Sequence, residues 1–340
     1  MEPASFPCAR PRRLRRTAAL RTAVRETTLA PSQLCAPLFV KDGIDAPQPV
    51  ASMPGVSQQT LHSLLVEVKE LRTAGVTSFL LFGVPAAKDP EGTQAWSPDG
   101  TVQRALRALR QDHGEEVVLI ADICLCDYTD HGHCGPVRAD GTVDNDAANA
   151  AYVRAAVSQA EAGADVVAPS GMMDGQVAAI RSALDEAGHA ETCAIMAYCT
   201  KYASAFYGPF RDAAECAPRF GDRTTYQLDP GNADEGVREA LADLAEGADI
   251  LMVKPAVPYL DVVYRVKQAT GMPLAAYHVS GEYAMIHAAA ANGWIDHDRV
   301  MTETLLGIRR AGADLVITYA AGWMARRLQG VGGRPPALHV

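Results

Sequence analysis

The chain has 340 residues, of which 48% are hydrophobic, and a formal net charge of −9 at pH 7. This length and composition suffice for a large buried core, either one barrel or two smaller domains. No apolar run reaches the roughly eighteen residues that a membrane-spanning helix needs, and no signal-peptide pattern begins the chain. We therefore expect an unexported, cytoplasmic protein without membrane association.

The first 30 residues are predicted to form a basic arm. Residues 1–25 hold seven arginines and one acidic residue, which leaves 24 basic and 39 acidic residues in the rest of the chain. An organelle transit peptide, a nucleic-acid-binding tail and a segment that docks on a neighbouring subunit all have this composition. The acidic remainder favours docking, and Leu14, Leu20 and Val24 would give the arm apolar surface to bury. We therefore expect no nucleic-acid partner.

One sequence pattern recurs along the chain: a helix end with glycine, followed by a short apolar run. It occupies segments 74–83, 162–170, 246–255 and 311–319. Each copy predicts a helix C-cap that leads into a buried strand. Four further apolar runs lie at 35–40, 117–125, 194–199 and 274–280. The sequence therefore predicts eight strands.

Helical patterns separate these strands. In segment 57–75, which ends at Gly75, apolar residues recur at helical spacing: Leu61, Leu64, Leu65, Val68 and Leu71. Eight alternating strand–helix units predict an α/β fold of the (β/α)₈ TIM-barrel type, since a doubly wound sheet would usually carry a Gly-rich phosphate motif that this sequence lacks. We assign residues 31–340 to the barrel and a short C-terminal tail.

A cysteine-rich segment follows the third predicted strand, where a TIM barrel places its functional groups. Residues 123–135 read ICLCDYTDHGHCG, with Cys124, Cys126 and Cys134 spaced C-x-C-x₇-C. Three thiolates with an open fourth position are typical of a zinc ion that substrate can reach, because a closed structural site normally has four protein ligands. Small buried side chains would explain two cysteines at a strand end but not a third in a Gly- and His-rich loop. We therefore predict a metal site.

Two lysines, Lys201 and Lys254, lie at the ends of the fifth and sixth predicted strands. A lysine attacks a ketone only as the free amine, so its pKa must fall from about 10.4 towards neutrality, which burial and a nearby cation achieve. A single lysine at a strand end is as often a surface residue that extends into solvent. Two of them beside a metal loop favour reactive amines.

Four further polar residues are candidates for substrate binding. Arg211 and Arg223 lie in a long segment between the fifth and sixth strands, which is typical of an active-site lid, and guanidinium groups bind carboxylates in bidentate fashion. Surface ion pairs are the alternative for these arginines. Ser280 and Tyr319 follow the seventh and eighth strands and offer hydroxyl donors, although hydroxyls with partners inside the core would fit equally well.

Several passages make the sequence similar to one known family along nearly its whole length. They read RPRRLRR, DICLCDYTDHGHCG, APSGMMDG, KYASAFYGPFRDA, YQLDPGN, LMVKPAVPYLD, YHVSGEYAM and RRAGADLVITY. They resemble the porphobilinogen synthase (5-aminolevulinic acid dehydratase) family. The resemblance implies a lyase of tetrapyrrole (heme) biosynthesis that condenses two molecules of 5-aminolevulinic acid into porphobilinogen with loss of two waters.

The resemblance also implies a role for each candidate residue. The three cysteines would bind a catalytic zinc ion, and Lys201 and Lys254 would form two Schiff bases. The two arginines would hold the carboxylate of one substrate molecule, and Ser280 and Tyr319 that of the other. Asp122 would orient groups near the metal or relay a proton. Glu239 matches a glutamate that binds an allosteric magnesium ion in some members, and the family assembles as homo-octamers with embracing arms.

The sequence departs from the family pattern at two positions. Gly171 stands where an aspartate usually follows the serine of the APS motif, and Thr225 stands where animal members have an extra cysteine. Two other interpretations remain open. One is a class I aldolase-like barrel with a single reactive lysine and a structural metal, and the other is a non-enzymatic metal-binding or assembly protein.

Overall fold

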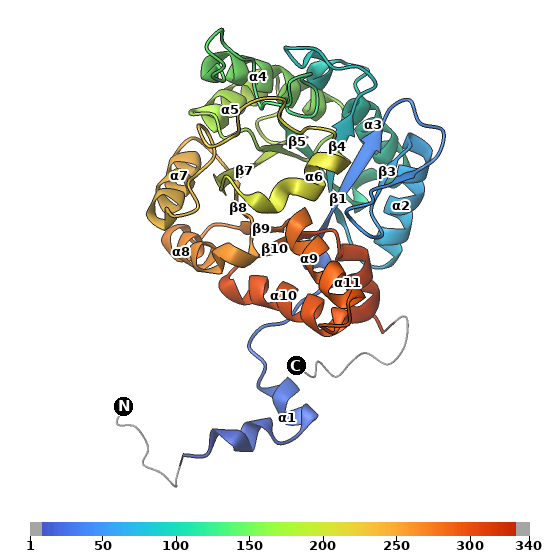
Figure 1. Cartoon of the computed structure of the whole chain (residues 1–340), viewed down its shortest axis with the longest axis vertical. Coiled ribbons are helices and arrows are strands. Elements are labelled where there is room, and N and C mark those ends of the chain that lie inside the picture. Colours follow the sequence, from blue (N-terminus) through green and yellow to red (C-terminus); the bar gives the residue numbers. More distant parts are fainter. Residues whose placement is uncertain (1–8, 331–340) are drawn as a thin grey trace.

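The computed structural model describes residues 9–330, in which eight parallel strands form a closed barrel. The strands are β1 (Leu34–Lys41), β4 (Ser78–Val84), β5 (Val118–Ile123), β6 (Val166–Pro169), β7 (Ala194–Lys201), β8 (Ile250–Lys254), β9 (Leu274–His278) and β10 (Leu315–Thr318). Each pairs with its successor in this order, and β10 pairs with β1 to close the ring (Figure 1). The predicted TIM barrel and its eight strands are confirmed.

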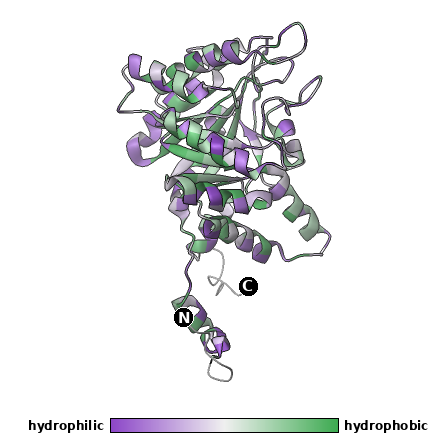
Figure 2. Ribbon diagram, turned by 90° about the vertical axis from the view of Figure 1, so that its left-hand side faces the viewer, coloured by the Kyte–Doolittle hydropathy of each residue, from purple (hydrophilic) through white to green (hydrophobic). Residues whose placement is uncertain are grey.

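Helices surround the barrel. They are α2 (Leu61–Thr73), α3 (Thr101–His113), α4 (Asn145–Glu161), α5 (Gln176–Glu186), α7 (Ala233–Ala245), α8 (Leu260–Thr270), α9 (Ser280–Ala291), α10 (His297–Ala311) and α11 (Ala321–Leu328). The short helix α6 (Gly208–Ala213) lies across the barrel mouth in Figure 1. The strands are the most consistently hydrophobic part of the chain in Figure 2, as expected for a parallel sheet covered on its outer face by helices.

The recurring pattern of a helix end with glycine is explained by the backbone conformation at these glycines. Gly75, Gly163, Gly247 and Gly312 all have positive φ, of 86°, 105°, 107° and 120°. Each follows a helix and turns the chain into the next strand, in a conformation that favours glycine. At Gly75 a Cβ atom would also approach Pro31 Cβ to 3.0 Å. The helix-to-strand turns predicted from the sequence are therefore confirmed.

Some predicted boundaries are wrong. Ser57–Gln59 forms strand β3, which pairs with β1 and with β2 (Gln48–Pro49), so the helix predicted from residue 57 begins only at Leu61. Thr60 caps this helix, because its Oγ1 accepts the backbone N–H of Ser63 at 3.0 Å. Leu61 is 37% exposed, unlike the buried Leu64. Ser280 belongs to the first turn of α9, since β9 ends at His278.

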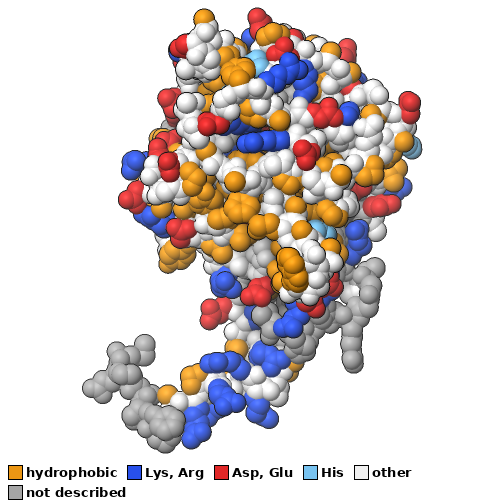
Figure 3. Space-filling view, viewed as in Figure 1, with side chains coloured by type: hydrophobic (Ala, Val, Ile, Leu, Met, Phe, Trp, Pro, Cys, Tyr) orange, Lys and Arg blue, Asp and Glu red, His pale blue; other side chains and the backbone are white. Residues whose placement is uncertain are grey.

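The basic arm contains a 3₁₀ helix, Pro11–Arg15, and helix α1, Ala18–Ala23. It projects away from the barrel in Figure 1, and Figure 3 shows basic side chains gathered along it. Leu14 and Val24 are about half exposed there, at 52% and 48%. Residues 1–8 of the predicted arm and the predicted tail beyond residue 330 lie outside the described residues. Between residues 9 and 330, no helix combines the length and the apolar character needed to cross a membrane.

Gly236 fixes the distance between α7 and β7, the strand that ends at Lys201. A Cβ atom at this position would lie 2.6 Å from Thr200 Cγ2 and 2.8 Å from Tyr202 Oη. We expect Gly236→Ala to lower the free energy of unfolding in urea, because overpacking costs about 1–3 kcal/mol and exceeds the gain of about 1 kcal/mol in helix propensity.

The matched control is Gly307→Ala in α10. Its Cβ would meet nothing closer than Arg310 Nη2 at 3.8 Å, so this variant should gain up to about 1 kcal/mol from helix propensity. Equal unfolding free energies for the two variants would contradict the packing argument.

Candidate active site

A cavity at the carboxyl ends of the strands, covered by α6, collects most of the predicted site residues. Both lysines, both arginines, Asp122 and one cysteine of the metal loop line it. The lining residues are Phe82, Asp122, Cys126, Ser170, Lys201, Tyr207, Phe210, Arg211, Arg223 and Lys254. They come from four strands of the barrel, from the loops after β5 and β6, and from the segment between β7 and α7, so the fold brings together groups that are up to 172 positions apart in the chain.

The two lysines are direct neighbours. Lys201 ends β7 and Lys254 ends β8, and the two residues are partners in the register of these parallel strands. Both are 5% exposed. Lys201 Nζ donates a hydrogen bond to the carbonyl oxygen of Ser170 at 2.5 Å. Two cations at one level of the barrel are costly when both are charged, which favours the free-amine form of one of them.

Lys254 is the amine that loses its charge. Burial, followed by the positive charge of Lys201, lowers its pKa to about 7. Aromatic rings surround its Nζ, with ring centroids at 4.3 Å for Tyr277 and 5.0 Å for Tyr198. Such rings favour a cation by roughly 1–2 kcal/mol and therefore oppose the effect of desolvation. A substantial fraction of Lys254 is therefore nucleophilic at neutral pH.

Asp122, the candidate proton carrier on β5, is also buried. Its Oδ2 accepts a hydrogen bond from Ser170 Oγ at 3.0 Å. Burial and then the charge of Asp127 raise its pKa to about 7, against the opposing effect of the two lysines. Its Oδ1 is buried and has no hydrogen-bond partner among residues 9–330. A carboxyl group in this state can accept or give a proton near neutral pH.

The three predicted cysteine ligands meet in the loop after β5. The sulfur atoms of Cys124, Cys126 and Cys134 lie within 4.8 Å of one another, all buried, with Cys124 and Cys126 Sγ 3.3 Å apart. Strand β5 ends at Ile123, so the loop after it brings Cys124 and Cys126 together. Burial raises the pKa of Cys124 well above its usual range, so a thiolate here requires a bound cation. The donor set fits a thiophilic divalent ion.

The two histidines of this loop have other partners. His131 Nε2 lies 3.1 Å from the carbonyl oxygen of Pro90. The ring of His133 is held between Tyr226 Oη, at 3.2 Å from Nδ1, and the Phe220 carbonyl oxygen, at 3.0 Å from Nε2. The loop therefore offers thiols rather than imidazoles to a metal ion.

The departure at Gly171 has a structural reason. Tyr152 of α4 donates a hydrogen bond to the carbonyl oxygen of Cys134 at 2.5 Å, so it supports the metal loop. A Cβ atom at residue 171 would lie only 1.8 Å from Tyr152 Oη. Glycine at residue 171 therefore leaves room for the Tyr152 side chain in its present position.

The arginines reach the cavity from the segment between β7 and α7. Arg223 is 6% exposed, and its Nη2 donates to the carbonyl oxygens of Gly132 and Cys216, both at 2.9 Å. The Nε atoms of Arg211 and Arg223 are buried, and within the described part of the chain neither has a hydrogen-bond partner. Two unsatisfied guanidinium donors suit an anionic group of a ligand.

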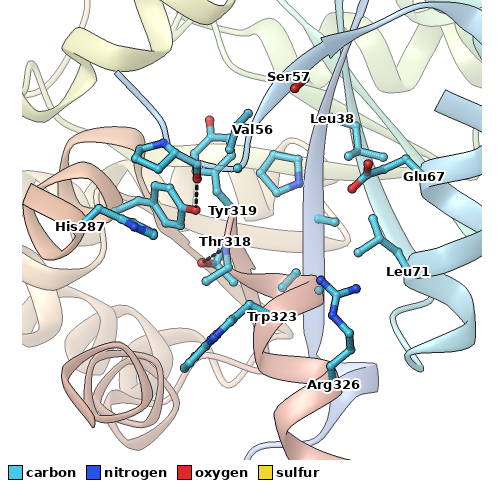
Figure 4. A pocket seen from close by; sticks show the side chains of 18 of the residues that line it. Leu38, Val56, Ser57, Glu67, Leu71, His287, Thr318, Tyr319, Trp323 and Arg326 are labelled. Carbon is cyan, nitrogen blue, oxygen red and sulfur yellow. Dashed lines mark hydrogen bonds between the residues drawn. The ribbon is translucent and has the colours of Figure 1, made fainter. Parts of the chain in front are cut away.

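Ser280 and Tyr319 lie outside the lysine cavity. Ser280 Oγ accepts the N–H of Phe210 at 2.9 Å, which holds α6 in place. Tyr319 Oη lies 3.1 Å from Tyr277 Oη, one side chain away from Lys254. Tyr319 lines a neighbouring cavity of about 370 Å³ between β1, α2 and α11 (Figure 4). No lysine lines that cavity, which therefore lacks the nucleophile.

Glu239 is remote from the lysines. It lies on α7 and lines a third cavity, of about 720 Å³, together with Asp174 and Glu235. Burial and the charges of these two carboxylates raise its pKa. Such a concentration of acidic groups is compatible with a hard divalent cation. Thr225 lines the same cavity and offers no thiol.

Sequence analysis missed the aromatic lining of the site. Tyr198, Tyr207, Phe210 and Tyr277 all approach Lys254 Nζ, within 5.4 Å of their ring centroids. The cluster of aromatic residues in segment 202–210 was the available signal. Tyr198 and Tyr277 lie inside strands, where an aromatic residue is indistinguishable from ordinary core.

Fold and site together define a TIM-barrel enzyme with paired buried lysines beside a thiol cluster. The family profile described as delta-aminolevulinic acid dehydratase matches residues 8–327. Proteins of that name are 54% identical in Synechococcus elongatus, over 94% of this chain and 100% of the relative, and 56% identical in Mycobacterium tuberculosis, over 95% and 100%.

A solved structure agrees with these relatives. The delta-aminolevulinic acid dehydratase (porphobilinogen synthase) of Toxoplasma gondii, in complex with the reaction product porphobilinogen, superposes with a TM-score of 0.91. It is 46% identical, over 94% of this chain and 91% of that one. The chain belongs to the delta-aminolevulinic acid dehydratase family.

The lowered pKa of Lys254 predicts how its reactivity depends on pH. The amine loses its proton as the pH rises through about 7, so trapping of a small ketone such as levulinate with cyanoborohydride should increase with a midpoint near that pH. Mass spectrometry of the modified peptide measures the yield.

The variant Lys201→Ala provides the comparison. It removes the neighbouring positive charge, so the midpoint should shift to higher pH. A midpoint near 10.4 in the unmodified protein, about the value of an exposed lysine, would contradict the assignment.

Proposed function

We propose that this chain condenses two molecules of 5-aminolevulinic acid into porphobilinogen with loss of two waters, as a lyase of tetrapyrrole (heme) biosynthesis. Family membership and the names of its relatives support this reaction. The observation that carries it is the pair of buried lysines in register on β7 and β8. Two amines in one cavity allow the enzyme to hold two identical ketones in different environments.

Each lysine would form one Schiff base. The free amine of Lys254 attacks the ketone carbon of the first substrate molecule and releases one water as the imine forms. Lys201 forms the second imine in the same way and releases the second water. A carbon–carbon and a carbon–nitrogen bond then join the two molecules, both lysine amines are displaced, and a final proton loss gives the pyrrole.

The arginines and hydroxyls would bind the two substrate carboxylates. Arg211 and Arg223 have unpaired buried Nε atoms at the cavity and would hold one of them. Ser280 and Tyr319 would hold the other. The Ser280 hydroxyl donates to the carbonyl oxygen of Phe206 at 3.3 Å, so this second role requires the hydroxyl to turn towards the substrate.

The metal loop would hold zinc on Cys124, Cys126 and Cys134. A zinc ion bound there supplies a Lewis acid that polarises a substrate oxygen and lowers the pKa of bound water. The nearby Asp122 carboxyl, with its pKa raised by burial, would take or return the proton moved in these steps. The resemblance also suggests an allosteric magnesium ion at Glu239, and the acidic cavity around that residue supports it.

The reaction is tested by measuring pyrrole formation from 5-aminolevulinic acid by the purified protein. We expect product that a zinc chelator abolishes and added zinc restores. Lys254→Ala and Lys201→Ala should each lower turnover by roughly a thousandfold or more. The matched control Lys69→Ala, at an exposed lysine of α2, should retain full activity.

Two outcomes would point elsewhere. Full turnover in Lys201→Ala would favour an aldolase-like barrel with one reactive lysine. Absence of product under every metal condition would contradict the proposed reaction.

The arm is proposed to dock on neighbouring copies of the chain in a homo-octamer. Leu14 and Val24 are exposed on a basic segment that projects away from its own barrel, whereas residues 26–340 carry a net charge of −15. We expect Arg12→Glu combined with Leu14→Ser to give smaller assemblies in analytical ultracentrifugation. Arg310→Glu, at an exposed arginine of α10, is the charge control and should leave the assembly unchanged.

A further inference from the structure

Cys216 is a buried cysteine to which the proposed reaction assigns no role. It lies shortly after α6 and is 1% exposed. Its Sγ, the Sγ of Cys126 and a carboxylate oxygen of Asp127 all lie within 4.8 Å of one another. Asp127 is 2% exposed, so all three donors are withdrawn from solvent. They form a second cluster that shares Cys126 with the metal triad.

Contacts of the neighbouring residue Glu215 fix the backbone so that the Cys216 thiol points towards the metal loop. Glu215 has φ = 53°, a left-handed conformation that is unfavourable for a side chain of this size. Its carboxylate is paired with Lys41 and accepts from Gln58 Nε2 at 3.1 Å, and its carbonyl oxygen accepts from Lys88 Nζ at 2.7 Å. A strained backbone that several contacts maintain is typical of a functional position. Glu215 faces these cations, while Cys216 turns towards the metal loop.

The donor set is suited to a thiophilic cation. Two thiolates and a carboxylate match the ligand preferences of zinc and of cadmium, which is softer. A thiolate sulfur has lone pairs for two metal ions, so Cys126 can belong to both clusters. A divalent ion would also offset two of the three negative charges of the buried Asp127 carboxylate and the two thiolates, which are costly to bury unpaired.

We propose that Cys126, Asp127 and Cys216 form a second site for a thiophilic divalent cation, bridged to the triad through Cys126 Sγ. The site rests on the proposed role of Cys126 as a ligand of the first ion. Cys216 belongs to the segment between β7 and α7, which also carries Arg211 and Arg223. An ion bound there ties this segment to the metal loop and holds it over the lysines.

A cadmium titration of the full-length apoprotein, reduced and kept free of oxygen, tests the site. The ultraviolet thiolate-to-cadmium charge-transfer band counts only thiolate-bound ions, so carboxylate sites such as the one at Glu239 do not contribute. We expect two thiolate-bound ions per chain in the unmodified protein and one in Cys216→Ala. Cys193→Ala, at a buried cysteine next to the start of β7, removes a thiol outside both clusters and should keep two.

Trypsin cleavage after Arg219 provides a second readout. Arg219 is exposed and lies three residues beyond Cys216, on the segment that the second ion would tie down. The second equivalent of cadmium should slow cleavage several-fold in the unmodified protein and in Cys193→Ala. In Cys216→Ala, cadmium beyond the first equivalent should have no effect on the cleavage rate.

Three results would overturn the second site. The first is one thiolate-bound ion, bound with equal affinity, in both the unmodified protein and Cys216→Ala. The second is two thiolate-bound ions in both proteins. The third is one thiolate-bound ion in both proteins, bound more weakly by Cys216→Ala. The last result would make Cys216 a fourth ligand of the triad ion. Absence of any thiolate-bound ion would instead contradict the first metal centre, which separates failure of the proposed function from failure of this inference.

Discussion

The site depends on the alignment of two lysines at the ends of adjacent parallel strands. The register of β7 and β8 makes Lys201 and Lys254 direct partners, and the closed barrel buries both. Burial and mutual repulsion then favour a neutral amine at Lys254, with its pKa near 7, despite surrounding rings that favour a cation. The proposed chemistry depends on this burial and charge repulsion, because an exposed lysine pair would remain protonated at neutral pH.

Other groups of the cavity are consistent with a site built for a ligand. Asp122 Oδ1, Tyr198 Oη and the Nε atoms of both arginines are buried and unpaired within residues 9–330. Buried polar atoms without partners are uncommon in folded proteins. Asp122, Arg211 and Arg223 line the lysine cavity, where a ligand with carboxylate and amine groups could contact these unpaired atoms. The neighbouring cavity beside Tyr319 is larger but neither lysine lines it, so cavity size alone does not locate the nucleophile.

The sequence predicted the barrel and its eight strands, because glycine turns and apolar runs are local patterns. It also named six of the ten residues that line the lysine cavity. It failed where the answer depends on contacts distant in the chain. Ser280 was assigned to a strand end, but it starts α9 and holds Phe210. Cys216 and Asp127 showed no motif, since their proximity to Cys126 arises from the folding of the segment after α6. The aromatic residues around Lys254 were hidden for the same reason.

The contact between Tyr152 and the backbone at Gly171 constrains how this protein can change during evolution. Any side chain at residue 171 would overlap the tyrosine ring, whereas a smaller residue at 152 creates space at the cost of one hydrogen bond to Cys134. An aspartate at residue 171 therefore requires either a smaller residue at 152 or a displaced tyrosine ring, and both remove the present support of the metal loop.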